Sequence, residues 1–165
     1  MMKVLVGYPS EEEEFVIVER VTGAATGVAA VATTEQLGAL QRQCRSGYVD
    51  PALIQYAVRL ASATRHPERY GVAELAKYVS FGASPRASIH LIEAARALAF
   101  LRGREYVLPE DVTDLAADVL RHRLVLTYDA LAEALTADEL IQRVMQRVPA
   151  PDKPLETHVR VGAKP

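Results

Sequence analysis

The stretch Gly82-Ala83-Ser84-Pro85-Arg86-Ala87 predicts the start of a helix, and the second half of the chain is organised around it. Gly82 ends the preceding segment, Ser84 suits the N-cap, and Pro85 suits the first helical position, where no backbone donor is needed. Arg86 then falls in the first turn, near the positive end of the helix dipole, where a cation is slightly unfavourable. That conflict points to a nearby acid or an anionic ligand. On these residues alone, a plain surface arginine is the alternative.

The helix that begins here is predicted to extend to about Arg102, where Gly103 ends it. Its core side carries apolar residues at helical spacing: Leu91, Ile92, Ala95, Leu98 and Ala99. His90 and Glu93 share the polar side with Arg86 but lie one and two turns beyond it. Neither of them is required to neutralise the arginine.

Five more amphipathic segments have helix-start signals of their own. Ser10 with Glu13 forms a capping box, and Asp50-Pro51 and Pro109 open helices with proline at the first position. The predicted apolar faces include Phe15, Val18 and Val21; Leu37, Leu40 and Cys44; Leu53, Ile54, Ala57, Val58 and Ala61; Val112, Leu115, Ala116, Val119 and Leu120; and Leu140, Ile141, Val144 and Val148. These patterns predict an all-α fold, a bundle of about five to six helices.

The two ends of the chain differ from the bundle. Lys3–Val6 is short, β-branched and apolar, which predicts a strand that lacks a partner in this chain. Gly7-Tyr8-Pro9 would end that strand. The tail from Pro149 to Pro165 has further prolines and few large apolar groups, so we expect it to be flexible or extended.

Composition excludes several classes of protein and site. The formal net charge of −2 gives no pull toward nucleic acid, and no helix concentrates cations, which disfavours a helix-turn-helix DNA binder. The single cysteine, Cys44, excludes an internal disulfide and is interpreted as a buried thiol. The runs of apolar residues are too short to span a membrane. No histidine has another histidine, a cysteine or a carboxylate at a spacing typical of metal sites. We therefore expect a soluble cytoplasmic chain with no metal site.

Phosphate-binding and nucleophilic motifs are missing from the sequence. It contains no Gly-x-x-x-x-Gly-Lys-Ser/Thr loop, no Gly-x-Gly-x-x-Gly after a strand, and no nucleophile elbow. The chain alone is therefore not expected to be a complete enzyme.

Several short motifs, taken in order, resemble the MoxR branch of the AAA+ ATPases over roughly residues 3 to 148. They are Gly-Tyr-Pro-Ser at 7–10, Tyr-Val-Asp-Pro-Ala-Leu-Ile at 48–54, Ala-Thr-Arg-His-Pro at 63–67, Gly-Ala-Ser-Pro-Arg-Ala at 82–87 and Ala-Arg-Ala-Leu-Ala-Phe-Leu-Arg-Gly-Arg at 95–104. Val-Leu-Pro-Glu-Asp-Val at 107–112 and Leu-Arg-His-Arg-Leu at 120–124 continue the match. Each motif is weak alone, whereas their order and spacing are specific.

The resemblance implies the C-terminal part of such an ATPase. Residues 1–9 would be the last strand and hinge of the AAA+ core, 10–148 the α-helical lid, and 149–165 a flexible tail. Arg86 would be the second sensor arginine, both catalytic and ATP-binding, and Tyr8 and Pro9 would form a hinge near the nucleotide. ATP and Mg would bind the intact protein and not this chain alone, because the Walker motifs would lie upstream.

The resemblance also implies partners. They are the upstream core of the same protein, the neighbouring subunits of a hexameric ring, and client proteins that are remodelled, with von Willebrand factor A-type domains or metalloenzymes among them. A free-standing helical interaction module, in which Arg86 contacts an acidic protein, is the alternative. The coding sequence before Met1 separates the two, because only the first requires an upstream Walker motif.

Overall fold

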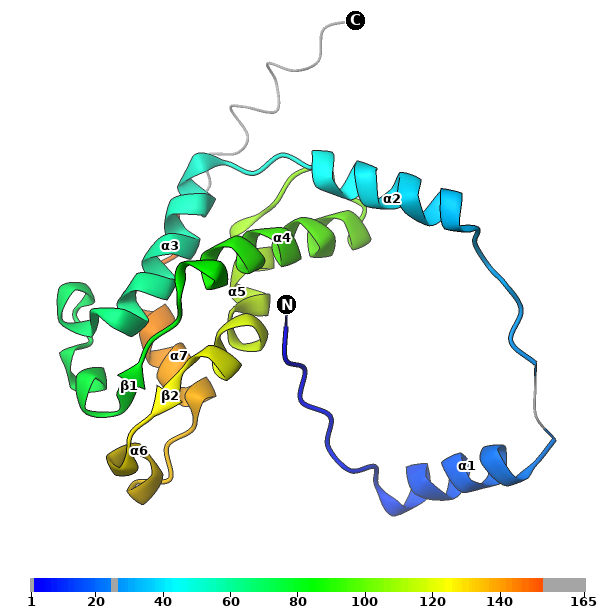
Figure 1. Cartoon of the computed structure of the whole chain (residues 1–165), viewed down its shortest axis with the longest axis horizontal. Coiled ribbons are helices and arrows are strands. Elements are labelled where there is room, and N and C mark those ends of the chain that lie inside the picture. Colours follow the sequence, from blue (N-terminus) through cyan, green and yellow to red (C-terminus); the bar gives the residue numbers. More distant parts are fainter. Residues whose placement is uncertain (1, 25–26, 153–165) are drawn as a thin grey trace, which may run out of the picture.

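A computed structural model describes residues 2–24 and 27–152, which form a mainly helical fold (Figure 1). The α-helices in these residues are α1 (Glu11–Thr22), α2 (Thr34–Ser46), α3 (Pro51–Arg65), α4 (Pro85–Leu101), α5 (Pro109–Leu120), α6 (Tyr128–Ala132) and α7 (Ala137–Arg147). Three 3-10 helices, η1 (Pro67–Tyr70), η2 (Ala73–Lys77) and η3 (Arg121–Arg123), and two strands, β1 (Val79–Phe81) and β2 (Val125–Leu126), lie between them. The predicted all-α class is confirmed.

Local sequence explains where most of these helices begin. Proline occupies the first turn of α3, α4 and α5, and capping boxes open α1, α2 and α7. Ser84 occupies the N-cap position of α4, but its side chain makes no capping hydrogen bond. Pro85 removes one of the amide donors that need a partner there, so the helix depends less on the serine than the sequence predicts.

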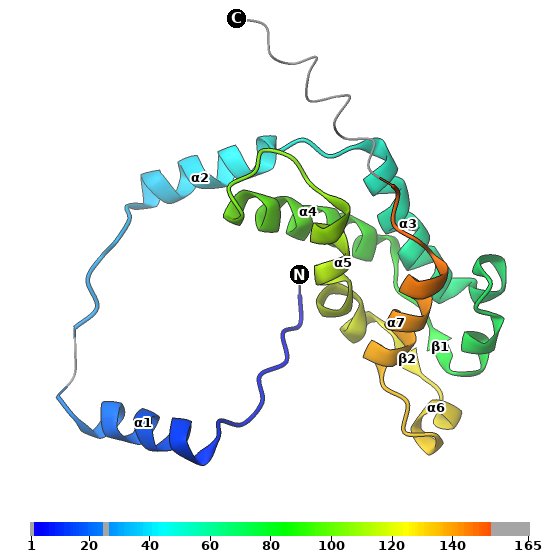
Figure 2. The same ribbon diagram turned by 180° about the vertical axis from the view of Figure 1, so that it is seen from behind.

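Helices α3, α4, α5 and α7 enclose the core, and α2 packs along α4 (Figures 1 and 2). The largest fully buried side chains are Leu53, Leu60, Leu75, Leu91, Leu120, Leu140 and Ile141. Ile54 and Val58, predicted in the core face of α3, are instead half-exposed. The buried arc of α3 is centred on Leu53 and Leu60, and these two residues lie at its margin.

Strands β1 and β2 form a small antiparallel sheet, with Val79 opposite Leu126 and Phe81 opposite Val125. Strand β1 precedes α4, whereas β2 follows η3 and leads into α6, a five-residue helix that sequence periodicity does not predict. Glu133, which follows α6, accepts hydrogen bonds from Lys77 and from the Tyr78 hydroxyl, each at 2.7 Å. These contacts hold the segment before β1 against the end of α6.

The N-terminal part stands off the packed body, with α1 apart from the other helices in both views (Figures 1 and 2). The segment Lys3–Val6, predicted as a strand whose partner lies outside this chain, pairs with no described strand, so its strand character stays a prediction. The Lys3 amide donates to the Asp118 carbonyl at 2.8 Å, and the Lys3 carbonyl accepts a hydrogen bond from Arg121 Nη1 at 2.6 Å. The apolar stripe predicted for α1 is also not buried.

At the other end, the described residues Pro149–Asp152 are neither helix nor strand. The rest of the tail, for which the sequence predicts flexibility, lies outside the described residues.

Candidate functional site

The loop before α4 is fastened to the end of α3 by both polar backbone groups of Ala83. The Ala83 amide donates to Thr64 Oγ1 at 2.9 Å, and the Thr64 hydroxyl donates to the Ala61 carbonyl at 2.7 Å. The Arg65 guanidinium donates to the Ala83 carbonyl. Because Ala83 and Thr64 are buried, these bonds are shielded from water and hold the loop in one position.

Gly82 lets that loop approach α3. A Cβ at this position would lie 2.3 Å from the Thr64 carbonyl oxygen and 2.7 Å from the Arg65 amide nitrogen. Both are backbone atoms and cannot turn aside as a flexible side chain would. The glycine that the sequence marks only as the end of a segment is therefore needed for close packing.

Arg86 emerges from this rigid base into solvent. It is exposed in the first turn of α4, while Ala83 and Ala87 on either side of it are fully buried. None of the hydrogen bonds or ion pairs among the described residues involves Arg86. Arg86 places a cation beside the positive end of the helix dipole, an arrangement that favours an added anion.

His90 and Glu93 do not neutralise Arg86. His90 Nδ1 lies 3.3 Å from a Glu93 carboxylate oxygen, so these two side chains pair with each other along the helix. Ile89, one turn after Arg86, is more than half exposed. The described surroundings of Arg86 therefore include an apolar side chain but no acid bonded to it.

At the far end of α4, Asp111 connects the helix to α5, and this role is missed by sequence reasoning. Its side chain is fully buried and accepts hydrogen bonds from Arg102 at 2.8 Å and from Arg104 at 2.7 and 2.6 Å. The Leu108 amide also donates to it at 2.8 Å. From the sequence, Asp111 is simply an acid in the first turn of a helix. Arg102 and Arg104, nine and seven residues before it, could have indicated an ion pair.

Stability should therefore depend on pH through Asp111. Burial alone would raise the pKa of this carboxyl, but the hydrogen bond from Arg104, the Leu108 amide and the arginine charges lower it overall from 3.8. A lowered folded-state pKa stabilises the fold above the unfolded value, and this contribution is lost as pH falls through the folded value. Urea unfolding of wild type and Asp111→Asn should differ by a constant amount above about pH 5, and the difference should shrink below about pH 4. A gap that widens in acid would contradict this.

The basic residues that end α5 are engaged in packing. Arg121 Nε donates to Asp138 on α7 at 2.8 Å, and its Nη1 donates to Asp118 and, at 2.6 Å, to the Lys3 carbonyl. Arg123 Nε donates to the Val119 carbonyl at 2.8 Å. These contacts favour the structural interpretation of this cluster over a phosphate contact.

Tyr8 and Pro9 lie beside α1, in a shallow groove with Val16 and Ile17, and the Tyr8 side chain is fully exposed. Because α1 stands apart from α4, the described structure does not bring these two residues together with Arg86 (Figure 1). Their predicted place near a nucleotide stays a prediction.

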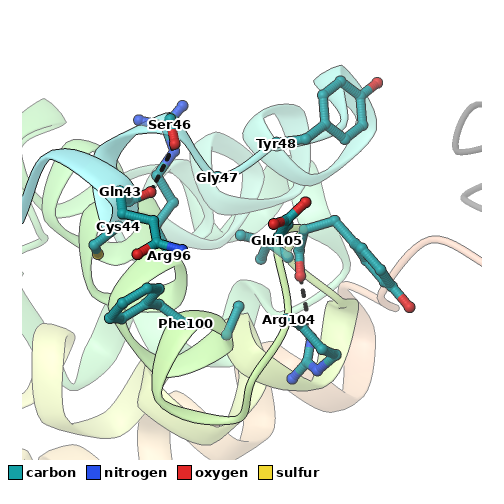
Figure 3. Close-up of a pocket in the computed structure, with 12 residues that line it drawn as sticks. Gln43, Cys44, Ser46, Gly47, Tyr48, Arg96, Phe100, Arg104 and Glu105 are labelled. Carbon is teal, nitrogen blue, oxygen red and sulfur yellow. Dashed lines mark hydrogen bonds between the residues drawn. The ribbon is translucent and has the colours of Figure 1, made fainter. Parts of the chain in front are cut away.

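A separate cavity of about 300 Å³ lies between the end of α2 and the loop of residues 102–108 that joins α4 to α5 (Figure 3). The Tyr48 amide donates to the Glu105 carbonyl at 2.8 Å, and the Val107 amide donates to the Tyr48 carbonyl at 3.0 Å. Arg96 extends from α4 toward Gln43 and Cys44 (Figure 3). Cys44, predicted to be buried, is partly exposed because it lines an open groove between α2 and α4.

Within residues 2–24 and 27–152, no three His, Cys, Asp or Glu side chains are placed to hold a metal ion. No helix in these ranges is both long and apolar enough to cross a lipid bilayer.

Comparison with known proteins places the Arg86 region in a described domain. The family model of the AAA lid domain matches residues 73–144, which include Arg86 and Asp111. "Chaperone MoxR1" of Mycobacterium tuberculosis is 47% identical over 151 residues, covering 92% of this chain and 40% of that protein. "Protein MoxR" of Paracoccus denitrificans is 39% identical over 122 residues, which cover 70% of this chain and 36% of that protein.

A solved structure agrees in fold. The crystal structure of a putative ATPase from Cytophaga hutchinsonii superposes with a TM-score of 0.86 at 32% identity, covering 92% of this chain and 47% of that one. The chain thus spans less than half the length of each of these three proteins.

Proposed function

Because this chain is the C-terminal α-helical lid domain of a MoxR-family AAA+ ATPase, we propose that Arg86 is the second sensor of the intact enzyme. In this role its guanidinium approaches the γ-phosphate of ATP held by the upstream core. The observation that carries the proposal is an exposed arginine without a described partner, at the start of a helix whose base is fixed to α3.

The chemistry of arginine suits this role. A guanidinium stays charged and presents a planar fork of donors to phosphate oxygens. As the γ-phosphate is transferred, charge on its oxygens is stabilised by a donor that is already in place. The buried bonds of Ala83 supply that preorganisation, because they prevent the first turn of α4 from shifting when phosphate binds.

Movement of the lid then links Arg86 to the state of the nucleotide. Tyr8 and Pro9 are proposed as the hinge between the core and the lid, with residues 10–148 moving as the lid. ATP and Mg are bound by Walker motifs upstream, so purified residues 1–165 are expected to hydrolyse no ATP above background. Rotation of the lid about such a hinge would move Arg86 toward or away from the γ-phosphate.

The wider role follows the family. The intact protein is proposed to be a cytoplasmic hexameric ATPase that remodels or activates partner proteins in a chaperone-like way. Clients with von Willebrand factor A-type domains or with metal centres fit that family role. The similarity to the mycobacterial relative, which is named a chaperone, supports this role.

Substituting Arg86 in the intact ATPase tests the proposal. Arg86→Ala should lower the rate of phosphate release from Mg-ATP by about tenfold to a hundredfold, because a donor to the transferring group is lost. Arg86→Lys should fall between, since the charge remains without the fork. Arg147→Ala, at an exposed arginine in the last turn of α7, is the matched control and should leave the rate unchanged. Normal turnover in Arg86→Ala, with the lid folded by circular dichroism, would remove Arg86 from the mechanism.

A further inference from the structure

Lys3 is the residue that bonds the N-terminal segment, residues 2–9, to the packed body, here residues 34–152. Its amide donates to the Asp118 carbonyl at 2.8 Å, and its carbonyl accepts from Arg121 Nη1 at 2.6 Å. Within the part of the chain that the structure describes, no other hydrogen bond joins this segment to the body. One residue, through both of its backbone polar groups, therefore fixes where the segment meets the body.

Arg121 presents to Lys3 a guanidinium that is already held in place. Its Nε donates at 2.8 Å to Asp138 in the first turn of α7, and its Nη1 also donates to Asp118 on α5. The Arg121 side chain is 13% exposed, so little water competes for these bonds. Because its planar fork is bonded to carboxylates on two helices, Arg121 cannot follow Lys3 if the segment moves. Movement of the segment away from the body would break the contact.

Arg86 is carried by the same packed helices as Arg121. Arg121 begins η3, directly after α5, and α5 packs along α4, the helix that starts beside Arg86 (Figure 1). Asp111 of α5 also bonds to Arg102 at the end of α4, at 2.8 Å. A displacement of the body that separates Arg121 from Lys3 would therefore also displace Arg86 relative to the N-terminal segment.

The contact spans the residues proposed as the hinge. Lys3 precedes residues 7–9, and Arg121 lies in the body that follows them. Residues 4–9 are exposed and make no hydrogen bond to another described residue, so few contacts oppose bending there. Rotation of the body about residues 7–9 would change the separation of Lys3 and Arg121.

We propose that Lys3, Asp118 and Arg121 form a latch that holds the lid in one position against the end of the core and must open before the lid can rotate. The latch rests on the proposed function in that residues 7–9 are the hinge, but it does not require Arg86 to contact phosphate. One neutral and one charge-assisted hydrogen bond favour the closed position by about tenfold to a hundredfold. A nucleotide that binds the open position more tightly by a larger factor releases the latch.

Hydrogen exchange of the Lys3 amide in the intact ATPase reports on the latch, because this amide is the donor to Asp118. Mass spectrometry with electron-transfer fragmentation resolves single amides and is applied without nucleotide, with Mg-ADP and with Mg and a non-hydrolysable ATP analogue. We expect slow exchange without nucleotide and exchange at least about fivefold faster in one or both nucleotide-bound states. The Tyr48 amide, bonded to the Glu105 carbonyl within the body, is the internal reference and should exchange equally in all three.

Substitution of Arg121 separates the latch from general packing. Without nucleotide, Arg121→Ala should accelerate Lys3 exchange by about tenfold, and nucleotide should then cause no further increase. The matched control is Asp138→Ala, which removes the α7 partner of Arg121 but leaves the bond to Lys3, so the change should be less than about threefold. Arg121→Lys keeps a cation between the two acids without the fork, and an intermediate rate is expected; this variant replaces Arg121→Ala if the alanine variant does not fold.

Three results would overturn the latch. They are rapid Lys3 exchange in the intact protein without nucleotide, equal exchange in all three nucleotide states, and equal acceleration by Arg121→Ala and Asp138→Ala. The third would mean that packing of α5 on α7, and not the guanidinium contact, protects Lys3.

The proposed function is judged by a different measurement, the hydrolysis rate of Arg86→Ala. Exchange at Lys3 that ignores nucleotide, together with slow hydrolysis by Arg86→Ala, would refute the latch alone. Exchange that follows nucleotide, together with normal hydrolysis by that variant, would refute the role of Arg86 alone.

Discussion

Replacing Asp111 by alanine is expected to lower the free energy of unfolding by about 3 kcal/mol. The carboxylate is fully buried and bonds to two guanidinium groups and a backbone amide. Its loss leaves Arg102 and Arg104 without their shared acceptor and leaves the Leu108 amide unpaired. Because Arg102 is 41% exposed and Arg104 is 20% exposed, water relieves part of the penalty, which places the effect at the lower end for broken buried pairs.

Asp114→Ala is the matched control. Asp114 also bonds to Arg102, at 2.7 Å, but is half exposed, so its loss should cost less than about 1 kcal/mol. Urea unfolding followed by circular dichroism measures both variants from the shift in midpoint. Equal midpoints for Asp111→Ala and Asp114→Ala would show that burial of Asp111 does not set its contribution.

Replacing Gly82 by alanine is expected to cost about 3 kcal/mol or slightly more, because the new methyl group would overlap backbone atoms of α3. The Thr64 carbonyl carbon would lie 2.5 Å from it, and the carbonyl oxygen is closer still. The loop can relieve the overlap only by breaking the bonds of Ala83 to Thr64 and Arg65. In the intact protein the same shift should displace Arg86, so the proposed second-sensor role predicts slower ATP hydrolysis as well.

Gly38→Ala provides the opposite control. Gly38 lies within α2, and a Cβ there would meet only the flexible end of Arg42, at 3.5 Å. Alanine should stabilise that helix by about 0.5 to 1 kcal/mol. Thermal unfolding of both variants separates a general glycine effect from the close approach at Gly82. A melting temperature of Gly82→Ala equal to wild type would contradict the packing argument.

Helix positions could be predicted closely where chemical start and stop signals are strong. Pro51, Pro85 and Pro109 are the first residues of α3, α4 and α5, as expected for a residue that lacks an amide donor. Helix α6 could not be predicted in this way. It is five residues long, and contacts of Glu133 with the distant Lys77 and Tyr78 hold its end in place.

Burial was harder to predict than helicity. Phe15 and Val18 have the spacing of a core face, yet α1 has no core to join in the described structure. Cys44 likewise has the periodicity of a buried residue but borders an open groove. Periodicity identifies the side of a helix that favours burial, whereas the neighbouring element decides whether burial occurs.

For the site, the sequence alone determined the position of Arg86, because the glycine, the proline and the arginine are local to one helix start. It also determined the family, through the order of several short motifs. Only the tertiary structure decided that Gly82 and Ala83 dock on α3, that Asp111 joins two arginines in the interior, and that Arg96 faces a groove beside α2. Each of these depends on a contact between different segments of the fold, and local propensity carries no information about such contacts.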